Sequence, residues 1–308
     1  MLTSFFGKSN PINYLIAGII IALGYLLGVI LYNDSLLTLN VIIEHLLFLG
    51  LSIFSMLLLD FVIRKNMLTK NNTYAILLFT CFLIAIPVIF TERAILVATI
   101  LLLLAFRRIL SLRSDKNTEK KILDASLWIT LASFFSFWSI LFFSILILAI
   151  TRKQNTNIKF LFIPVVGFFG VFVLRTAFQF LLNDSFNWFY NWRPSFNFNF
   201  SAYNQAILLI PAAVIATFII WTIIARILRL GAIPKKEKPN AILMLFTILV
   251  CIAISFLSPQ KNGSELLFII FPLTIIITNY IENLSEFWFK EILLWLAVLL
   301  PILTLFLY

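Results

Sequence analysis

Long apolar runs alternate with short polar segments along the whole chain, as in the stretches IIIALGYLLGVIL and ILLLLAF. In the hydrocarbon core of a bilayer every backbone N–H and C=O must find a partner within the protein, so each run is expected to form a helix. The pattern predicts an all-α, polytopic transmembrane helical bundle in which residues 1–308 make one integral-membrane domain. About eleven spans are predicted, at 12–32, 38–63, 73–90, 93–110, 122–135, 138–151, 158–182, 206–229, 240–257, 264–281 and 291–308.

The composition favours lipid as the solvent for most of this chain. Hydrophobic residues make up 62% of the sequence, charged residues make up 12%, and the mean hydropathy is +1.06. Soluble domains are about half apolar and about a quarter charged. The first apolar run begins near Pro11 and has no small-residue cleavage pattern after it, so we expect an anchor rather than a cleaved signal.

Basic residues gather in four of the polar segments. The segments 64–72, 107–121, 152–159 and 226–239 hold 17 of the 23 Lys and Arg residues, and an even number of predicted spans separates each from the next. All four therefore share one side of the membrane, which the positive-inside rule makes the cytoplasm. We expect a bacterial inner-membrane protein with a cytoplasmic N-terminus, whose net charge of +10 is an orientation signal.

Residues 122–151 decide whether the number of spans between two of the basic segments is even, because they form thirty mostly apolar positions between those segments. Two short helices, broken near Phe135–Ser139, would keep both segments on one side. Each helix would have about 14 residues and measure ~21 Å, which is short of the ~30 Å hydrocarbon core. The alternative is one kinked span, with the C-terminal half of the chain inverted.

Ionisable groups at the opposite ends of the spans are the candidates for chemistry, because charge is costly at membrane depth. Asp34 follows the first span, and Glu92 and Arg93 form the turn between the third and fourth. In a catalytic interpretation Asp34 is the general base and Glu92 is the second catalytic candidate. Glu92 and Arg93 would then lie at an anionic leaving group. In the alternative interpretation these charges only end helices in water.

The segment 183–205 is the most unusual stretch, with nine aromatic residues. Its alternation FNFNFSAY has the period of a strand or an extended segment. Aromatic rings beside Asn suit stacking on sugar rings, and they equally suit a belt in the lipid headgroup layer. The substrate-binding candidates, besides Arg93, are Arg175 late in the preceding span and four residues of this segment, Trp188, Tyr190, Trp192 and Arg193.

Motifs of soluble enzymes are missing from the sequence. It has no Walker A loop, Gly-rich dinucleotide loop, HExxH, CxxC or GxSxG. Cys81 and Cys251 lie within apolar runs, and His45 is the only histidine. We therefore expect no cofactor, no metal site and no nucleic-acid partner; the expected partners are membrane lipids, a polyprenyl-phosphate-linked sugar and other envelope proteins.

Several stretches resemble a family of uncharacterised multi-pass proteins from Bacteroidota. The stretches are FFGKSNPINYLI, LTKNNTYAILLF and AFRRILSLRSDKNTEKKILDASLWITLASFFSFWSILFF, and the resemblance covers nearly the whole chain. It implies an inner-membrane protein. Some members carry the label beta-carotene monooxygenase, but that enzyme needs four histidines for its iron and this chain has only His45.

The order of parts also resembles the GT-C class of membrane glycosyltransferases, which use polyprenyl-phosphate-linked sugars. Asp34 follows the first span, ERAILVATILLLLAF with Glu92 opens a Leu-rich span, and SELLFIIFPLTIIITNYIE is similar to the late span of that class. The resemblance implies a GT-C-like fold and, if the chain is an enzyme, a polyprenyl-phosphate-sugar-dependent glycosyltransferase. The sequence departs from the class in its short first outer segment and in lacking the paired acidic motif.

Three functions follow as hypotheses. The first is a GT-C-like envelope protein that acts on or binds a polyprenyl-linked sugar or lipid at the outer leaflet. The second is a non-enzymatic subunit or scaffold of an envelope or secretion assembly. The third is a transporter of lipids or small molecules.

Overall fold

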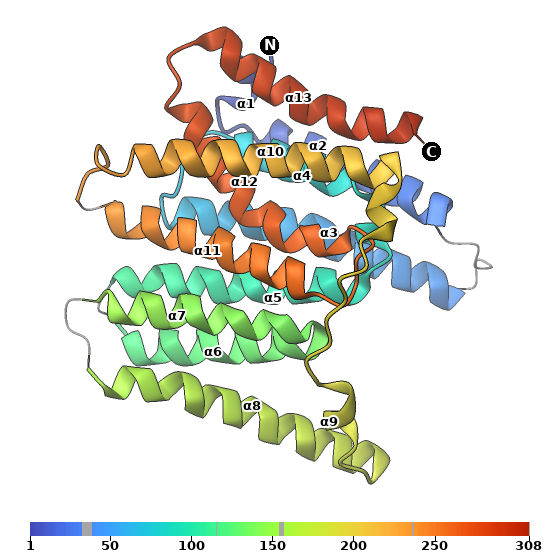
Figure 1. Cartoon of the computed structure of the whole chain (residues 1–308), viewed down its shortest axis with the longest axis vertical. Helices are drawn as coiled ribbons and strands as arrows, with labels where there is room; N and C mark the ends of the chain where they lie inside the picture. Colours follow the sequence, from blue (N-terminus) through green and yellow to red (C-terminus); the bar gives the residue numbers. More distant parts are fainter. Residues whose placement is uncertain (33–38, 115, 154–156, 236, 308) are drawn as a thin grey trace.

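The computed structural model describes residues 1–32, 39–114, 116–153, 157–235 and 237–307, and in these ranges every regular element is a helix (Figure 1). Each predicted apolar run contains one α-helix, and in some runs a short 3₁₀ turn accompanies it. These helices are α2 (Pro11–Tyr32), α3 (Leu39–Lys65), α4 (Tyr74–Ile84), α5 (Arg93–Leu110), α6 (Thr118–Phe135), α7 (Phe142–Thr151), α8 (Lys159–Asn183), α10 (Ala206–Leu228), α11 (Lys238–Leu257), α12 (Leu267–Glu282) and α13 (Phe287–Phe306). Short helices complete the described chain: α1 (Leu2–Phe6), η1 (Pro87–Phe90), η2 (Ser111–Arg113), η3 (Phe137–Leu141), α9 (Trp188–Asn191), η4 (Ser201–Asn204) and η5 (Ser264–Leu266).

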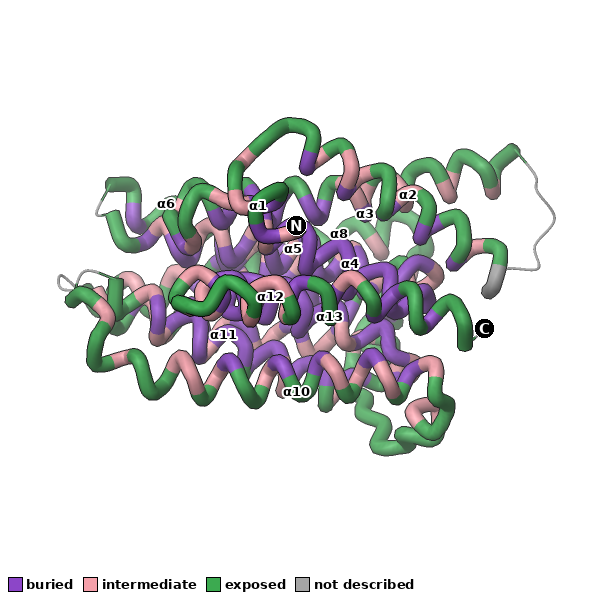
Figure 2. The backbone as a smooth tube through the Cα atoms, turned by 90° about the horizontal axis from the view of Figure 1, so that it is seen from above, coloured by how far each residue is buried: buried purple, intermediate pink, exposed green. Residues whose placement is uncertain are grey.

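Eight helical segments within the described residues are long and apolar enough to cross a membrane. The chain is therefore a multi-pass membrane protein with an all-α bundle, as the hydrophobic pattern predicts. The outermost helices, such as α8 and α13, expose many of their apolar side chains. In Figure 2 the buried positions gather in the middle of the bundle and the exposed ones lie along the outer helices, which is the pattern expected where lipid covers the surface.

The predicted span 73–90 is divided in the structure. Helix α4 ends at Ile84, and a 3₁₀ turn begins at Pro87. Proline disfavours the helical conformation in the residue before it, and Ile86 accordingly has φ −129° and ψ 78°. The 11 residues of α4 would cover only ~16 Å at 1.5 Å per residue. All but Tyr74 are buried, so protein rather than lipid surrounds this short helix.

The hairpin predicted within 122–151 is confirmed. Helix α6 ends at Phe135, Ser136 adopts an extended conformation, and α7 returns toward the end from which α6 started (Figure 1). The 10 residues of α7 are short for a span, but the ring of Phe142 packs against Phe106 of α5 and Phe271 of α12. Because of this packing, α7 lies against neighbouring helices within the bundle.

The two ends of the bundle differ in character. In Figure 1 the connections that follow α3, α5, α7 and α10 lie at one end, and the segment between α8 and α10 lies at the other. The four basic segments of the sequence therefore share one end, as their even spacing predicts. We call it the basic end, and we call the opposite end the aromatic end.

Candidate binding site at the aromatic end

The segment 192–205 runs across the aromatic end from α9 to α10, along the ends of several helices (Figure 1). Its first hydrogen bond runs from the indole N–H of Trp192 to the carbonyl of Ser133 in α6, at 3.0 Å. The indole N–H of Trp138 in η3 donates to the carbonyl of Ser195 at 2.7 Å. We call this segment the aromatic strap, because its indole contacts join it to α6 and η3.

The period-two alternation of the strap does not reflect a β-strand, because the described residues 194–200 form no β-ladder. Its explanation lies in the contacts of the alternating side chains. The rings of Phe198 and Phe200 pack on Phe256 of α11, with ring centroids 5.6 and 5.9 Å away. The side chain of Asn199 accepts a hydrogen bond from the backbone N–H of Ser201 at 3.0 Å. Aromatic positions thus anchor the segment, and asparagines satisfy its backbone.

The far end of the strap is fixed by a buried carboxylate. The hydroxyl of Tyr203 donates to Glu265 Oε1 at 2.7 Å, and the backbone N–H of Gly263 donates to Glu265 Oε2 at 2.9 Å. Glu265 is only 2% exposed. Burial raises the pKa of the Tyr203 hydroxyl, and the nearby charge of Glu265 raises it further. Gly263 has a φ of +96°, which favours glycine at this tight turn.

Lys261 is the buried cation beside this carboxylate. Its ammonium donates to the carbonyls of Ser255 and Phe256 at 2.7 and 2.8 Å and lies 5.3 Å from the ring centroid of Phe200. Burial lowers the pKa of Lys261, and the charge of Glu265 opposes that shift. The sequence shows Lys261 and Glu265 only as charges beside a span, without indicating these partners.

Glu92 is engaged with the loop that precedes α12. Its two carboxylate oxygens accept hydrogen bonds from the side-chain amides of Gln260 at 3.0 Å and Asn262 at 2.8 Å. It is also the residue that precedes the first turn of α5. In the structure Glu92 therefore joins the start of α5 to this loop.

Arg93 is engaged with α3. Its guanidinium forms an ion pair with Glu44 and lies over the ring of Phe48 at 5.2 Å. Asp34, the candidate general base, lies outside the described residues. The structure thus gives partners to Glu92 and Arg93.

Arg175 lies in a cavity of about 260 Å³ between α6, α8 and α9. Its guanidinium carbon lies 6.0 Å from the ring centroid of Phe134. Arg175 lies two turns before the end of α8 at Asn183, a distance of ~12 Å at 1.5 Å per residue. The cavity is lined by one cation, four polar side chains and three aromatic rings, namely Arg175; Gln179, Ser185, Asn187 and Asn191; and Phe134, Trp188 and Trp192.

One wall of this cavity is a packed aromatic cluster. The ring of Trp188 lies 5.6 Å from that of Phe134 and 5.0 Å from that of Phe172, while Trp192 lies 5.9 Å from Phe134. Trp188 is 7% exposed, and its indole N–H has no hydrogen-bond partner among the described residues. A buried N–H of this kind is costly unless a ligand or water accepts from it.

The chain matches the model of a protein family over residues 7–308. It belongs to DUF6427, a family of unknown function. No curated protein and no solved structure matches the chain. The DUF6427 region begins before α2 and includes every long helix and the aromatic strap.

In this DUF6427 chain the structure brings together three of the residues predicted to bind a substrate: Arg175, Trp188 and Trp192. Tyr190 is 73% exposed, and neither it nor Arg193 lines the cavity. Glu92 and Arg93 do not line it either. Sequence reasoning missed Phe134, which lines the cavity, and Phe172, which packs on Trp188. A Phe within a membrane span carries no signal that separates a ring at a cavity from a lipid-facing ring.

Proposed function

We propose that this DUF6427 chain is an inner-membrane envelope protein that binds a lipid-linked sugar phosphate at the outer leaflet, in the cavity around Arg175. In this proposal the aromatic end faces away from the cytoplasm. The observation that carries the proposal is the exposed guanidinium of Arg175 on a membrane span, in a cavity whose described lining contains no carboxylate.

The chemistry of the cavity fits a phosphate joined to a sugar and an apolar tail. A cation at membrane depth is costly when it has no counter-charge. A phosphate supplies that charge, and guanidinium binds it with two parallel hydrogen bonds. The amides of Gln179, Asn187 and Asn191 suit sugar hydroxyls, and the exposed apolar side chains of α8 suit an isoprenoid chain.

The geometry favours binding over glycosyl transfer by the residues of this cavity. Transfer to a hydroxyl needs a general base within hydrogen-bond reach of the acceptor. The cavity supplies no such carboxylate from its described lining, and Glu92 accepts hydrogen bonds from Gln260 and Asn262 elsewhere on this end. A glycosyltransferase activity based on Asp34 remains a separate hypothesis, and so do the scaffold and transporter functions.

The proposal is tested by titrating the protein, in neutral-lipid nanodiscs, with undecaprenyl phosphate and following tryptophan fluorescence. We expect R175Q to weaken binding about tenfold or more, because charged hydrogen bonds contribute ~1.5–3 kcal/mol. R193Q removes the same charge from the same end without touching the cavity and is expected to bind as the wild type does. Equal binding by R175Q, or equal binding of uncharged undecaprenol, would refute the proposal.

A further inference from the structure

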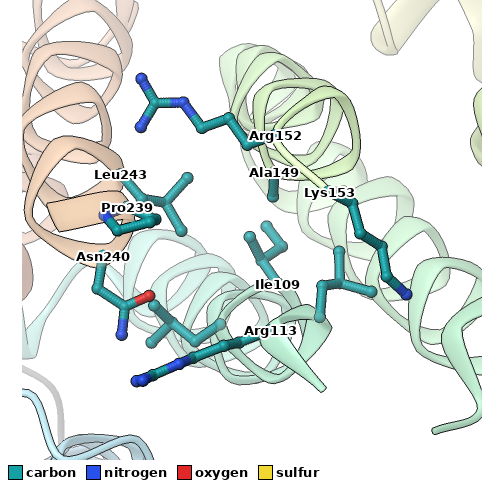
Figure 3. Close-up of a pocket in the computed structure, with 10 residues that line it drawn as sticks. Ile109, Arg113, Ala149, Arg152, Lys153, Pro239, Asn240 and Leu243 are labelled. Atoms are coloured by element: carbon teal, nitrogen blue, oxygen red, sulfur yellow. The ribbon is translucent and has the colours of Figure 1, made fainter. Parts of the chain in front are cut away.

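A second group of cavities lies at the basic end, remote from Arg175. One of them, of about 300 Å³, opens between α5, α7 and α11 (Figure 3). Its floor is apolar and includes Ile109, Ala149 and Leu243. Figure 3 shows Arg113 and Arg152 on two sides of the cavity.

The charged side chains in the described lining of this cavity are all cationic. Its described lining includes Arg113, Arg152 and Lys153 and no carboxylate. Arg113 and Arg152 are exposed, and neither guanidinium forms a hydrogen bond or ion pair with another described residue. Arg108 shows the contrast, because its guanidinium pairs with Asp124 at 2.8 Å. The fold thus neutralises a neighbouring arginine and leaves two arginines in the lining of one cavity without a counter-charge among the described residues.

Arg113 also lines a larger cavity of about 530 Å³, which extends toward α10 and α12. Two further arginines lie there, Arg226 and Arg229. The Nε atom of Arg226 is buried without a hydrogen-bond partner among the described residues, and its Nη1 donates to Asn279 Oδ1 at a long 3.4 Å. The described lining of this cavity also holds two carboxylates, Glu237 and Glu282, and Glu282 accepts a hydrogen bond from the backbone N–H of Lys70 at 2.8 Å.

We propose that the basic end holds a site for a phosphate-bearing ligand, with the phosphate between Arg113 and Arg152. Guanidinium groups match phosphate oxygens in a planar, two-bond geometry, and two of them around one apolar-floored cavity suit a single anion. Phosphate is the chemistry shared by an anionic phospholipid headgroup and a soluble phosphate compound. The site is separate from the Arg175 cavity, and neither proposal depends on the other.

The test uses the full-length protein in a zwitterionic detergent. Its two probes are inorganic phosphate and dihexanoyl-phosphatidylglycerol below its micelle concentration. Dihexanoyl-phosphatidylcholine, whose phosphate charge is offset by its choline cation, is the net-neutral reference. Binding is measured by microscale thermophoresis at constant ionic strength. We expect saturable binding of at least one phosphate probe and an affinity about tenfold or more weaker in R113Q/R152Q. A preference for phosphatidylglycerol identifies a lipid headgroup as the source, and comparable binding of inorganic phosphate identifies a soluble one.

The matched control is K65Q/K120Q, which removes two charges from the same end at exposed residues outside both cavities. We expect it to bind as the wild type does. Equal weakening in the two double variants would overturn the proposal, because it would mean that the general charge of this end attracts the probe. Absence of saturable binding by the wild type would overturn it as well. Thermal unfolding of each variant separates lost binding from lost fold. The variant R113K/R152K keeps the charge and is expected to bind with an affinity between those of the wild type and R113Q/R152Q.

Discussion

Tyr203 and Glu265 are the pair on which the end of the aromatic strap depends. Glu265 is buried among apolar helices, and its two oxygens are satisfied by the Tyr203 hydroxyl and by the backbone N–H of Gly263. A buried carboxylate that loses a donor keeps the cost of its desolvation without the compensating bond. This hydrogen bond therefore joins the strap to the start of α12.

Substitution of Tyr203 by phenylalanine tests that dependence. We expect Y203F to lower the free energy of unfolding by ~1–3 kcal/mol, because Glu265 Oε1 is left buried without its donor. The measurement is thermal or denaturant unfolding in detergent, with Y190F as control since Tyr190 is 73% exposed. An unchanged stability of Y203F would show that water replaces the hydroxyl.

These residues also mark the limit of prediction from sequence. Arg175, Trp188 and Trp192 were predictable as binding candidates, because a charge within a span and Trp beside Asn are unusual in themselves. The role of Glu265 was not predictable, since its partner Tyr203 lies 62 positions away in the sequence. The amide partners of Glu92 lie 168 and 170 positions away in the sequence. A glutamate at a span end suggested a catalytic role, whereas its contacts in the structure connect two distant segments of the chain.

At the scale of elements, the contact between α6 and α8 holds the walls of the Arg175 cavity together, because Phe134 comes from α6 and Arg175 from α8. The two helices meet closely at Gly167. A Cβ atom on Gly167 would lie 2.9 Å from the Cβ of Ser126 and still closer to its hydroxyl oxygen. That oxygen is held by a hydrogen bond to the carbonyl of Leu123 at 2.7 Å.

We therefore expect G167A to reduce both thermal stability and binding at the Arg175 cavity, although alanine is the better helix former by ~1 kcal/mol. The control is G170A, one turn further along the same helix, where a Cβ meets nothing within 4 Å. That variant should be neutral or slightly stabilising. The pair S126G/G167A restores the space and should recover much of the loss. A G167A protein as stable as G170A would mean that α8 shifts freely on α6.

The α6–α7 hairpin was predictable and the break after α4 was not. Basic segments on both sides of 122–151 favour a chain that turns back, so the positive-inside rule favoured two short helices there over one kinked span. No such constraint applied to 73–90, where hydrophobicity predicted one span. Its break depends on the conformation that Pro87 imposes on Ile86, and on neighbouring helices that bury the short α4.

At the scale of the whole molecule, charge is distributed between the two ends in a way that predicts an orientation in the membrane. The four basic segments hold 17 of the 23 Lys and Arg residues, and they meet at the end opposite the aromatic strap (Figure 1). Cationic segments resist transfer across the membrane, so the basic end is expected in the cytoplasm. The two proposed sites would then face opposite leaflets, one for a lipid-linked sugar and one for a phosphate.

Cysteine labelling of intact cells tests this orientation directly. Ser114 at the basic end and Arg193 at the aromatic end are both exposed, so S114C and R193C place reactive thiols on opposite sides. The native Cys81 and Cys251 are 5% and 0% exposed, so the wild type serves as an unlabelled control. We expect a membrane-impermeant maleimide to label R193C in spheroplasts, and to label S114C only after the membrane is permeabilised. Labelling of S114C from outside would show that the orientation is the reverse of the one predicted, with the Arg175 cavity at the cytoplasmic leaflet. Because the lipid-linked sugar proposal requires the outer leaflet, that one result would refute it, whereas the phosphate site at the basic end would remain testable with the same probes.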